Sequence, residues 1–233
     1  MKIIVLGRGN AGCFTALHLS YHLPNYNIEL IYDPDVPPEK VGQASLIEAP
    51  ALLWLTLGLN WYENVINATP KLGILYENWG KKNKYIFNPF VFNATAMHYD
   101  PKKLQEVILK SGYFKVKKKS INNPHKLKAN YIFDCRGKRI NDYSEYNILD
   151  NPLNSVILGQ SNTSDPKQLW TRAVATPDGW TFVIPNTTNT TSYGYLYNDK
   201  FTSLKQATSN FQKLFKLAKH NYYLGDKVNN FKF

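Results

Sequence analysis

The stretch KIIVLGRGNAG, from Lys2 to Gly12, decides the fold of this chain. Its first half, Lys2–Leu6, is a short apolar run of the kind that forms a buried parallel strand. A helix predicted over Cys13–Leu23 follows, and a second apolar strand predicted over Ile28–Tyr32 completes a βαβ unit of about thirty residues. This order of elements predicts an α/β fold with an FAD/NAD(P)-binding, Rossmann-like parallel sheet.

Three glycines after the first strand match the spacing G-x-G-x-x-G, in the context where that spacing is informative. Gly7 permits a tight turn, Gly9 lets a pyrophosphate approach the backbone, and Gly12 lets the helix pack closely on the strand. Asp33, at the end of the second strand, is placed to accept hydrogen bonds from a ribose. The cofactor-binding residues predicted here are Gly7, Gly9, Asn10, Ala11, Gly12 and Asp33. The alternative is a strand–helix turn without a ligand, and the motif alone does not separate NAD from FAD.

A late apolar strand, within Tyr131–Gly137, ends in a polar turn that contains a glycine. In a flavoprotein with this fold such a strand returns beside the first βαβ unit, so its turn passes near the cofactor. We therefore add Asp134 and Gly137 to the predicted cofactor-binding residues. Spacing alone favours this interpretation no more than an ordinary strand end.

Composition excludes several classes of protein. The chain has 233 residues, 43% of them apolar, which is too apolar for a disordered chain. Two cysteines, Cys13 and Cys135, cannot build a disulfide scaffold or a four-cysteine zinc site, so we expect no metal and a reducing, cytoplasmic location. No apolar run reaches the ~18 residues of a membrane span. The net charge of +11 permits nucleic-acid binding, but the densest lysine run, 115–119, lacks a nucleic-acid motif and is expected to be a solvated turn.

The remaining elements follow from periodicity and propensity. Helices are predicted over Leu46–Leu59, Trp61–Ala68, Pro101–Ser111 and Thr202–Lys219. Strands are predicted over Leu72–Trp79, Tyr113–Lys117 and Asn130–Phe133, in a β-rich region from Val156 to Tyr197, and from Asn230 at the chain end. We expect one FAD-binding unit over 1–233, with a nucleotide-binding core (1–40 and 96–140), a β-rich substrate-side layer (41–95 and 150–200) and a C-terminal helix (202–220).

Five stretches follow one another in an order that one family shares. They are Val41–Ser45 (VGQAS), Asn67–Gly73 (NATPKLG) with Asn78-Trp79, Met97–Asp100 (MHYD), Gly179–Pro185 (GWTFVIP) and Gly194–Tyr197 (GYLY). Together they make the chain resemble the flavin-dependent tryptophan halogenases over nearly its whole length. Two positions depart from the family pattern: Gln43 replaces a glutamate, which removes a charge near the flavin, and Phe182 replaces the second tryptophan of W-x-W-x-I-P.

The resemblance implies a reaction and a role for each matched residue. Reduced FAD, supplied by a separate flavin reductase, reacts with oxygen and a halide ion to give hypohalous acid, which halogenates a small electron-rich aromatic such as an indole. Lys71 would be the catalytic lysine that holds or activates the hypohalous acid. Gly42, Gln43, Ala44 and Ser45 would line the flavin. Trp180 and Pro185, on the substrate side, would block a monooxygenase route.

The family continues beyond the stretch that corresponds to this chain, with a late glycine-rich segment, a glutamate that works with the lysine, and a helical region over the substrate pocket. We therefore expect a second polypeptide or self-association to complete the protein, as in a split enzyme. The alternatives are a truncated, non-catalytic FAD- or nucleotide-binding module and another FAD-dependent monooxygenase. A basic nucleic-acid binder ranks last.

Overall fold

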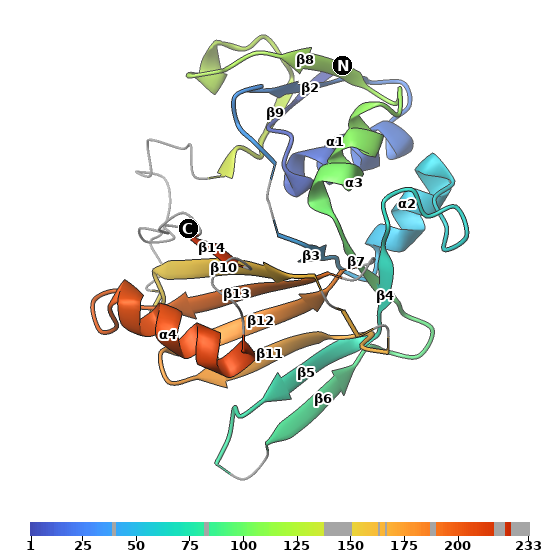
Figure 1. Ribbon diagram of the computed structural model, residues 1–233. Coiled ribbons are helices and arrows are strands. Elements are labelled where there is room, and N and C mark those ends of the chain that lie inside the picture. The colour runs from blue at the N-terminus through green and yellow to red at the C-terminus, as the bar shows by residue number, and fades with distance from the viewer. Residues whose placement is uncertain are drawn as a thin grey trace. The chain divides into compact units, whose positions relative to one another are not determined.

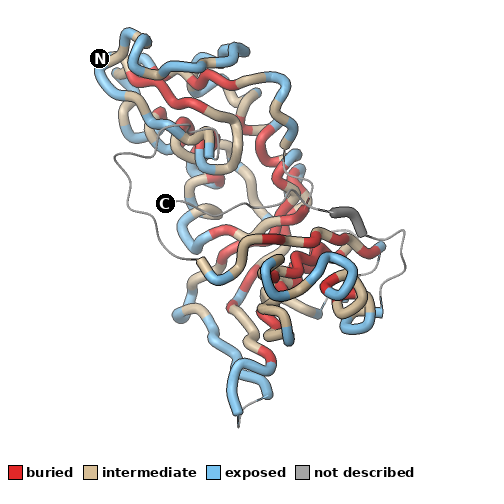
Figure 2. Tube along the Cα trace, turned by 90° about the vertical axis from the view of Figure 1, so that its left-hand side faces the viewer, coloured by how far each residue is buried: buried red, intermediate tan, exposed pale blue. Residues whose placement is uncertain are grey.

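The computed structural model describes residues 1–38, 41–81, 84–137, 151–162, 164–165, 167–186, 190–216 and 222–224, the last three by their backbone alone (Figure 1). The chain divides into two compact units. Unit 1 comprises 1–40, 50–66 and 100–142, and unit 2 comprises 41–49, 67–99 and 143–233. Both units contain buried residues, in segments that alternate with exposed ones along the chain (Figure 2).

Unit 1 is built on a four-stranded parallel sheet with the order β8-β2-β1-β9. Its strands are β1 (Lys2–Leu6), β2 (Asn27–Tyr32), β8 (Lys115–Lys118) and β9 (Tyr131–Asp134). Helix α1 (Asn10–His22) packs on the sheet and on α3 (Pro101–Leu109), as Figure 1 shows. The unit also holds most of α2 (Ala49–Leu57) and the short 3₁₀ helix η1 (Pro124–Lys126).

Helix α3 shows how the sequence sets a boundary. Asp100 accepts backbone hydrogen bonds from Lys102 (2.8 Å) and Lys103 (3.3 Å), which satisfies two of the free N–H groups of the first turn. Pro101 occupies the first helical position, where a missing N–H costs nothing. The apolar face of the helix then buries Leu104 and Ile108 completely.

Unit 2 contains a mixed seven-stranded sheet with the order β14-β10-β13-β12-β11-β5-β6, in which only the β11–β5 pair is parallel among the described strands. Its strands are β5 (Gly73–Glu77), β6 (Tyr85–Pro89), β10 (Ser155–Ser161), β11 (Thr171–Thr176), β12 (Gly179–Pro185), β13 (Thr191–Tyr197) and β14 (Tyr222–Leu224). Helix α4 (Leu204–Phe215) lies across one face of this sheet (Figure 1).

The core of unit 2 lies between α4 and that face. Along β10, burial alternates residue by residue, so Ser155 and Ile157 point toward the helix while Val156 and Leu158 point to the opposite face. The core residues are Ile157, Val174, Val183, Tyr193, Tyr195 and Tyr197 from the sheet, with Ala207 and Phe211 from α4.

A small antiparallel sheet of three strands completes unit 2. Its central strand is β7 (Ala96–Tyr99), which pairs with β3 (Gln43–Ala44) on one side and with β4 (Thr69–Lys71) on the other. The register places Ala44 and Thr69 both opposite His98. This sheet therefore joins three of the stretches that carry the family resemblance.

These observations confirm the predicted fold class, a Rossmann-like parallel sheet with an added β-rich part. The helix predicted over Trp61–Ala68 is wrong, because the side chain of Asn60 accepts hydrogen bonds from the N–H groups of Tyr62 and Glu63 and fixes a turn there. The lysine run 115–119 is also not a turn, since Lys115–Lys118 forms the edge strand β8, where exposed lysines deter pairing with other strands.

The predicted strand at Asn230–Phe233 and the last residues of the predicted helix Thr202–Lys219 lie outside the described residues. Within the described part of the chain, helices are too short or too polar to cross a membrane.

Candidate functional site

The glycine turn after β1 has the backbone geometry that the motif predicts. Gly7 has a φ of +100°, and a Cβ atom there would lie 2.7 Å from the carbonyl oxygen of Cys135. A Cβ on Gly12 would lie 2.0 Å from the carbonyl oxygen of Gly7. Both positions therefore require glycine, because a side chain would collide with the backbone that surrounds the turn.

The N-terminus of α1 follows this turn directly. Its N-cap residue is Gly9, in an extended conformation, and no side chain in the described part of the chain caps the helix there. The first turn carries no acidic residue, so the positive end of the helix dipole is compatible with a phosphate group. The side chain of Asn10 accepts a hydrogen bond of 3.3 Å from Gln105 of α3, and Ala11 is exposed. The geometry thus fits the diphosphate of a dinucleotide.

Asp33 lies where β2 ends, in unit 1 with the glycines. Its side chain accepts a hydrogen bond of 2.9 Å from the backbone N–H of Asp35, which shapes the loop that follows the strand. Nearby, Arg8 donates to the carbonyl oxygen of Val36 (2.7 Å) and lies over the ring of Tyr32. Arg8, the second residue of the glycine motif, therefore contacts the same loop after β2.

The turn after β9 is occupied by an internal ion pair. The guanidinium of Arg136 lies 2.6 Å from the carboxylate of Asp134. Hydrogen bonding to Arg136 lowers the pKa of Asp134, and the same contact raises the pKa of Arg136. Gly137 has a φ of +65° and is exposed. Asp134 thus carries a negative charge that its neighbour already balances.

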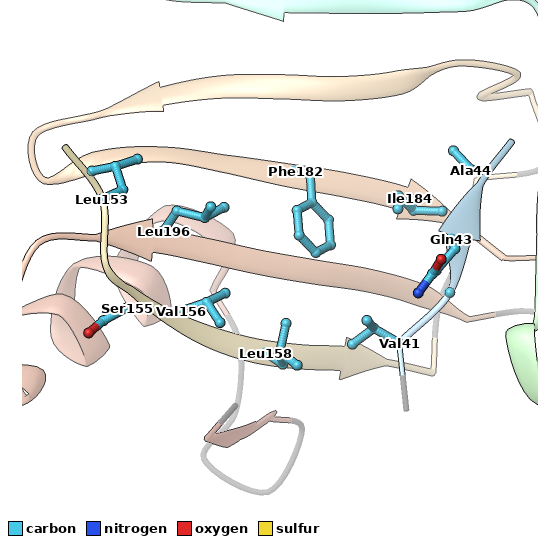
Figure 3. Close-up of a pocket in the computed structure, with 11 residues that line it drawn as sticks. Val41, Gln43, Ala44, Leu153, Ser155, Val156, Leu158, Phe182, Ile184 and Leu196 are labelled. Atoms are coloured by element: carbon cyan, nitrogen blue, oxygen red, sulfur yellow. The ribbon is translucent and has the colours of Figure 1, made fainter. Parts of the chain in front are cut away.

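A cavity of about 480 Å³ lies in unit 2, on the face of the seven-stranded sheet opposite α4 (Figure 3). Phe182 and Ile184 of β12 and Leu196 of β13 point into it, as do Val156 and Leu158 of β10 (Figure 3). The segment Val41–Ala44 borders the cavity at one end (Figure 3). The cavity is mostly apolar and of a size suited to a planar organic group.

Gly42 is held in this wall by polar groups that the sequence did not reveal. Its N–H donates to the hydroxyl of Ser192 (2.9 Å), which also accepts from the amide of Asn186 (2.8 Å). A Cβ on Gly42 would lie 1.8 Å from the Oδ1 atom of Asn186. Ser45 instead serves β7, since its backbone N–H donates to the carbonyl of Met97 and its hydroxyl accepts from the N–H of Met97.

Lys71 ends β4 and is 8% exposed. Its ammonium lies 5.3 Å from the centre of the Phe90 ring, and none of the described acidic side chains forms an ion pair with it. Burial lowers the pKa of Lys71, because an ammonium loses solvation there. Two residues earlier, the hydroxyl of Thr69 donates to the carbonyl of Pro185 (3.4 Å), so β4 reaches the end of β12.

Trp180 belongs to a row of aromatic rings on the cavity face of the sheet. Its ring centre lies 6.3 Å from that of Trp79 and 6.4 Å from that of Phe182. The indole N–H of Trp79 donates to the carbonyl of Ala173 (2.8 Å), which fixes one end of the row. Phe182 points into the cavity, and Pro185 is buried at the end of β12.

The predicted site residues fall into two groups, one in each unit. Unit 1 holds Gly7, Gly9, Asn10, Ala11, Gly12, Asp33, Asp134 and Gly137. Unit 2 holds Gly42, Gln43, Ala44, Ser45, Lys71, Trp180 and Pro185. Sequence reasoning missed Ser192, which accepts a hydrogen bond from Gly42 of the second group, and Asn186, which bonds to Ser192. Only Asn186 had a signal, because it directly follows the Ile-Pro of a quoted stretch.

Comparison with known proteins identifies one family. The sequence model described as "Tryptophan halogenase" matches residues 2–123 and 103–224. A tryptophan halogenase structure from Shewanella frigidimarina is 17% identical, with a TM-score of 0.79 over 100% of this chain and 63% of its own. A tryptophan 6-halogenase from Streptomyces toxytricini is 18% identical, with a TM-score of 0.75 over 92% of this chain and 59% of its own.

A flavin-dependent halogenase from Xanthomonas campestris is similar to the same extent, at 16% identity and a TM-score of 0.75 over 99% of this chain and 62% of its own. At these identities the structural matches show the fold. The chain spans less than two thirds of each of these three proteins.

Proposed function

We propose a function for this chain from one premise: it belongs to the tryptophan halogenase family. The protein takes part in halogenating an electron-rich aromatic substrate of the indole type, with reduced FAD, oxygen and a halide ion. It does so alone or as one half of a split enzyme. A flavin reductase and a small aromatic molecule are its proposed partners.

One observation carries this proposal: Lys71 is a buried lysine without an acidic partner among the described residues. A buried ammonium without a counter-ion destabilises a fold, so such a residue is typically retained for chemistry. Because burial lowers the pKa of Lys71, a larger fraction of the amine is neutral near pH 7 than for an exposed lysine. This amine can donate a hydrogen bond to hypohalous acid or react with it as a nucleophile.

The glycine turn and the N-terminus of α1 supply the proposed FAD contacts. Gly7, Gly9 and Gly12 shape a backbone that a diphosphate can approach, and Asp33 lies at the strand end where a ribose hydroxyl is bound in this fold. The segment Val41–Ala44 borders a cavity that suits a flat ring system. Bound reduced FAD would supply the chemistry that converts oxygen and halide into hypohalous acid.

Trp180 and Pro185 form the proposed substrate-side wall. The row Trp79, Trp180 and Phe182 offers aromatic faces and edges, which suit an indole ring, and Pro185 lies near the strand that carries Lys71. These apolar side chains would keep water from the reacting halogen species.

The experiment supplies purified protein with a flavin reductase, FAD, oxygen, bromide or chloride, and a panel of indoles, and detects halogenated product by mass spectrometry. Wild-type protein should give product, whereas Lys71→Met should give none and still bind FAD. Absence of product from the wild-type protein, both alone and with the product of the adjacent gene, would refute halogenation.

Two glycine variants separate FAD binding from folding. Gly9→Ala should weaken FAD binding but leave the thermal midpoint unchanged, because the extended backbone of Gly9 suits alanine. Gly12→Ala should lower both the affinity for FAD and the thermal midpoint, because its Cβ would collide with the carbonyl of Gly7.

A non-catalytic nucleotide-binding module is the second candidate. The glycine turn and the N-terminus of α1 lie together in unit 1, so this unit by itself carries the proposed diphosphate contacts. In that case titration would change flavin fluorescence, but no product would form. Hydroxylated product instead of halogenated product would indicate an FAD-dependent monooxygenase.

A further inference from the structure

His98 occupies the centre of the three-stranded sheet in unit 2. The register of β7 places it opposite Ala44 of β3 and opposite Thr69 of β4. Residues directly opposite each other share one face of a sheet, and so do residues two apart on a strand. Lys71 follows Thr69 by two positions, so His98 and Lys71 lie on the same face as diagonal neighbours, with Cα atoms about 7–8 Å apart in such a pair.

The imidazole is held from one side only. His98 is completely buried, and its Nε2 atom lies 2.9 Å from the hydroxyl of Thr171 at the start of β11. Its Nδ1 atom is buried and has no hydrogen-bond partner among the described residues. An orphaned N–H donor is rarer in proteins than an under-used acceptor, so we assign the proton to Nε2 and leave a lone pair on Nδ1.

We propose that His98 is a positioning residue for Lys71: an uncharged imidazole, tethered by Thr171, that keeps the amine dry on the face which the two residues share. This inference rests on the proposed function, since it assigns His98 to the amine on which that function depends. The imidazole lies opposite Ala44 and Thr69 and bonds to Thr171, diagonal to Lys71 on the shared face, where it would keep water from the stem of the lysine.

The electrostatics are consistent with this role. Burial, and then the charge of Lys71, lower the pKa of His98 to about 3, so the ring stays neutral from pH 5 upward. Lys71 is the charged group that acts on His98 in the described part of the chain. Arg172, next to Thr171 on β11, points to the opposite face and pairs there with Glu77 of β5. Lys71 therefore has a polar neighbour that adds no positive charge.

Competitive labelling measures the proton affinity of Lys71 directly. Protein without flavin, halide or substrate is treated with trace acetic anhydride across a pH series, and mass spectrometry gives the labelled fraction of Lys71 at each pH. Wild-type protein should show a midpoint below the 10.5 of an ordinary lysine. His98→Ala should raise this midpoint by about half a pH unit or more, because water enters beside the amine, and lower the neutral fraction at pH 7 roughly threefold.

Two further variants make the result specific. His98→Gln keeps a neutral polar side chain that can donate to Thr171, so it should retain the low midpoint. Thr171→Val keeps the imidazole and removes only its tether, so it should raise the midpoint part of the way. Thr181→Val is the matched control, because Thr181 is a completely buried threonine of β12 whose hydroxyl bonds to the neighbouring carbonyl of Phe182, and it should change nothing.

If His98→Ala fails to fold, as judged by its circular dichroism, Thr171→Val decides the question. An unchanged Lys71 midpoint in every folded His98 and Thr171 variant would overturn the proposal. The labelling needs no turnover, so a wild-type protein that labels as expected but halogenates nothing would refute the proposed function and leave this pairing in place.

Discussion

At the residue scale, Lys71 and His98 are two basic side chains in surroundings that disfavour their charged forms. Each side chain is buried and the pKa of each is lowered, so protonation of either works against the folded state. Ionisable side chains are rarely buried in a protein core unless each has a partner of opposite charge or a hydrogen-bond partner. The burial of two such side chains on one face of a small sheet favours a functional site over plain core packing.

Removing the amine of Lys71 should therefore stabilise the protein. We expect Lys71→Met to raise Tm by roughly 2–4 °C, the shift that about 1 kcal/mol produces in a protein of this size. The flexible methionine occupies a similar volume and carries no charge to desolvate. Differential scanning calorimetry at pH 7 measures the change, and Lys102→Met, at an exposed position of α3, is the control. A lower Tm in Lys71→Met would contradict this account of the amine.

His98 should make stability depend on pH in acid. Its folded-state pKa of about 3 lies below the ordinary value of 6.5, so between these values the unfolded chain binds a proton that the folded chain does not. The free energy of unfolding should thus fall as the pH drops from about 6.5, by up to about 1.4 kcal/mol per pH unit from this group alone.

Urea titrations at several pH values between 4 and 7 test this prediction. In His98→Gln the slope of the unfolding free energy against pH should be smaller by up to one proton. Equal slopes in the two proteins would show that His98 titrates normally in the folded state.

At the element scale, one carboxylate adds polar links to the apolar core between α4 and the seven-stranded sheet. Asp178, in the turn between β11 and β12, accepts hydrogen bonds from Tyr195 of β13 (2.6 Å), from Thr202 before α4 (3.1 Å) and from Asn210 within α4 (2.8 Å). Burial alone would raise the pKa of Asp178, but these three donors outweigh it and lower the pKa. Burial and the bond to Asp178 raise the pKa of Tyr195 to about 12.

Asp178→Asn should weaken this contact, since an amide presents one acceptor and an N–H₂ group to three donors. We expect a loss of about 2–3 kcal/mol in unfolding free energy, within the range for hydrogen bonds to charged groups. Urea unfolding measures it, and exposed Asp165→Asn is the matched control, because the side chain of Asp165 accepts a single hydrogen bond, from the N–H of Lys167, among the described residues. Equal stability of the two variants would show that the three hydrogen bonds of Asp178 do not contribute measurably to the stability of the fold.

At the scale of the whole molecule, large apolar side chains remain exposed. Tyr62 is 99% exposed, Phe92 93% and Leu46 78%, and Trp54 and Leu55 of α2 are 56% exposed each. Exposed apolar side chains that gather into a contiguous patch commonly mark interaction sites. These exposed side chains favour association with a second polypeptide or with another copy.

Sedimentation velocity over a range of protein concentrations should therefore show self-association when the protein is alone, and a hydrophobic dye should bind it. Association through apolar surface should persist in 1 M salt, because salt screens charges and does not weaken apolar contacts. A monomer at every concentration that binds no dye would contradict the prediction, and association lost in high salt would point to charge instead.

The sequence by itself determined the first βαβ unit and its glycine turn. The reason is local: the positive φ of Gly7, the tight packing at Gly12 and the apolar runs of β1 and β2 all act between residues close in the chain or on adjacent strands. Pattern failed at Trp61–Ala68 for an equally local reason, since the Asn60 side chain competes with the helix for the N–H groups of Tyr62 and Glu63.

Only the tertiary structure decided the surroundings of Lys71. The sequence places a lysine at a strand start and cannot show whether it meets water. Burial came from contacts with Phe90 and from a sheet whose central His98 bonds to Thr171, 73 residues further along the chain. Solvation of a charge depends on every atom packed around it, and those atoms come from strands that only the folded chain brings together.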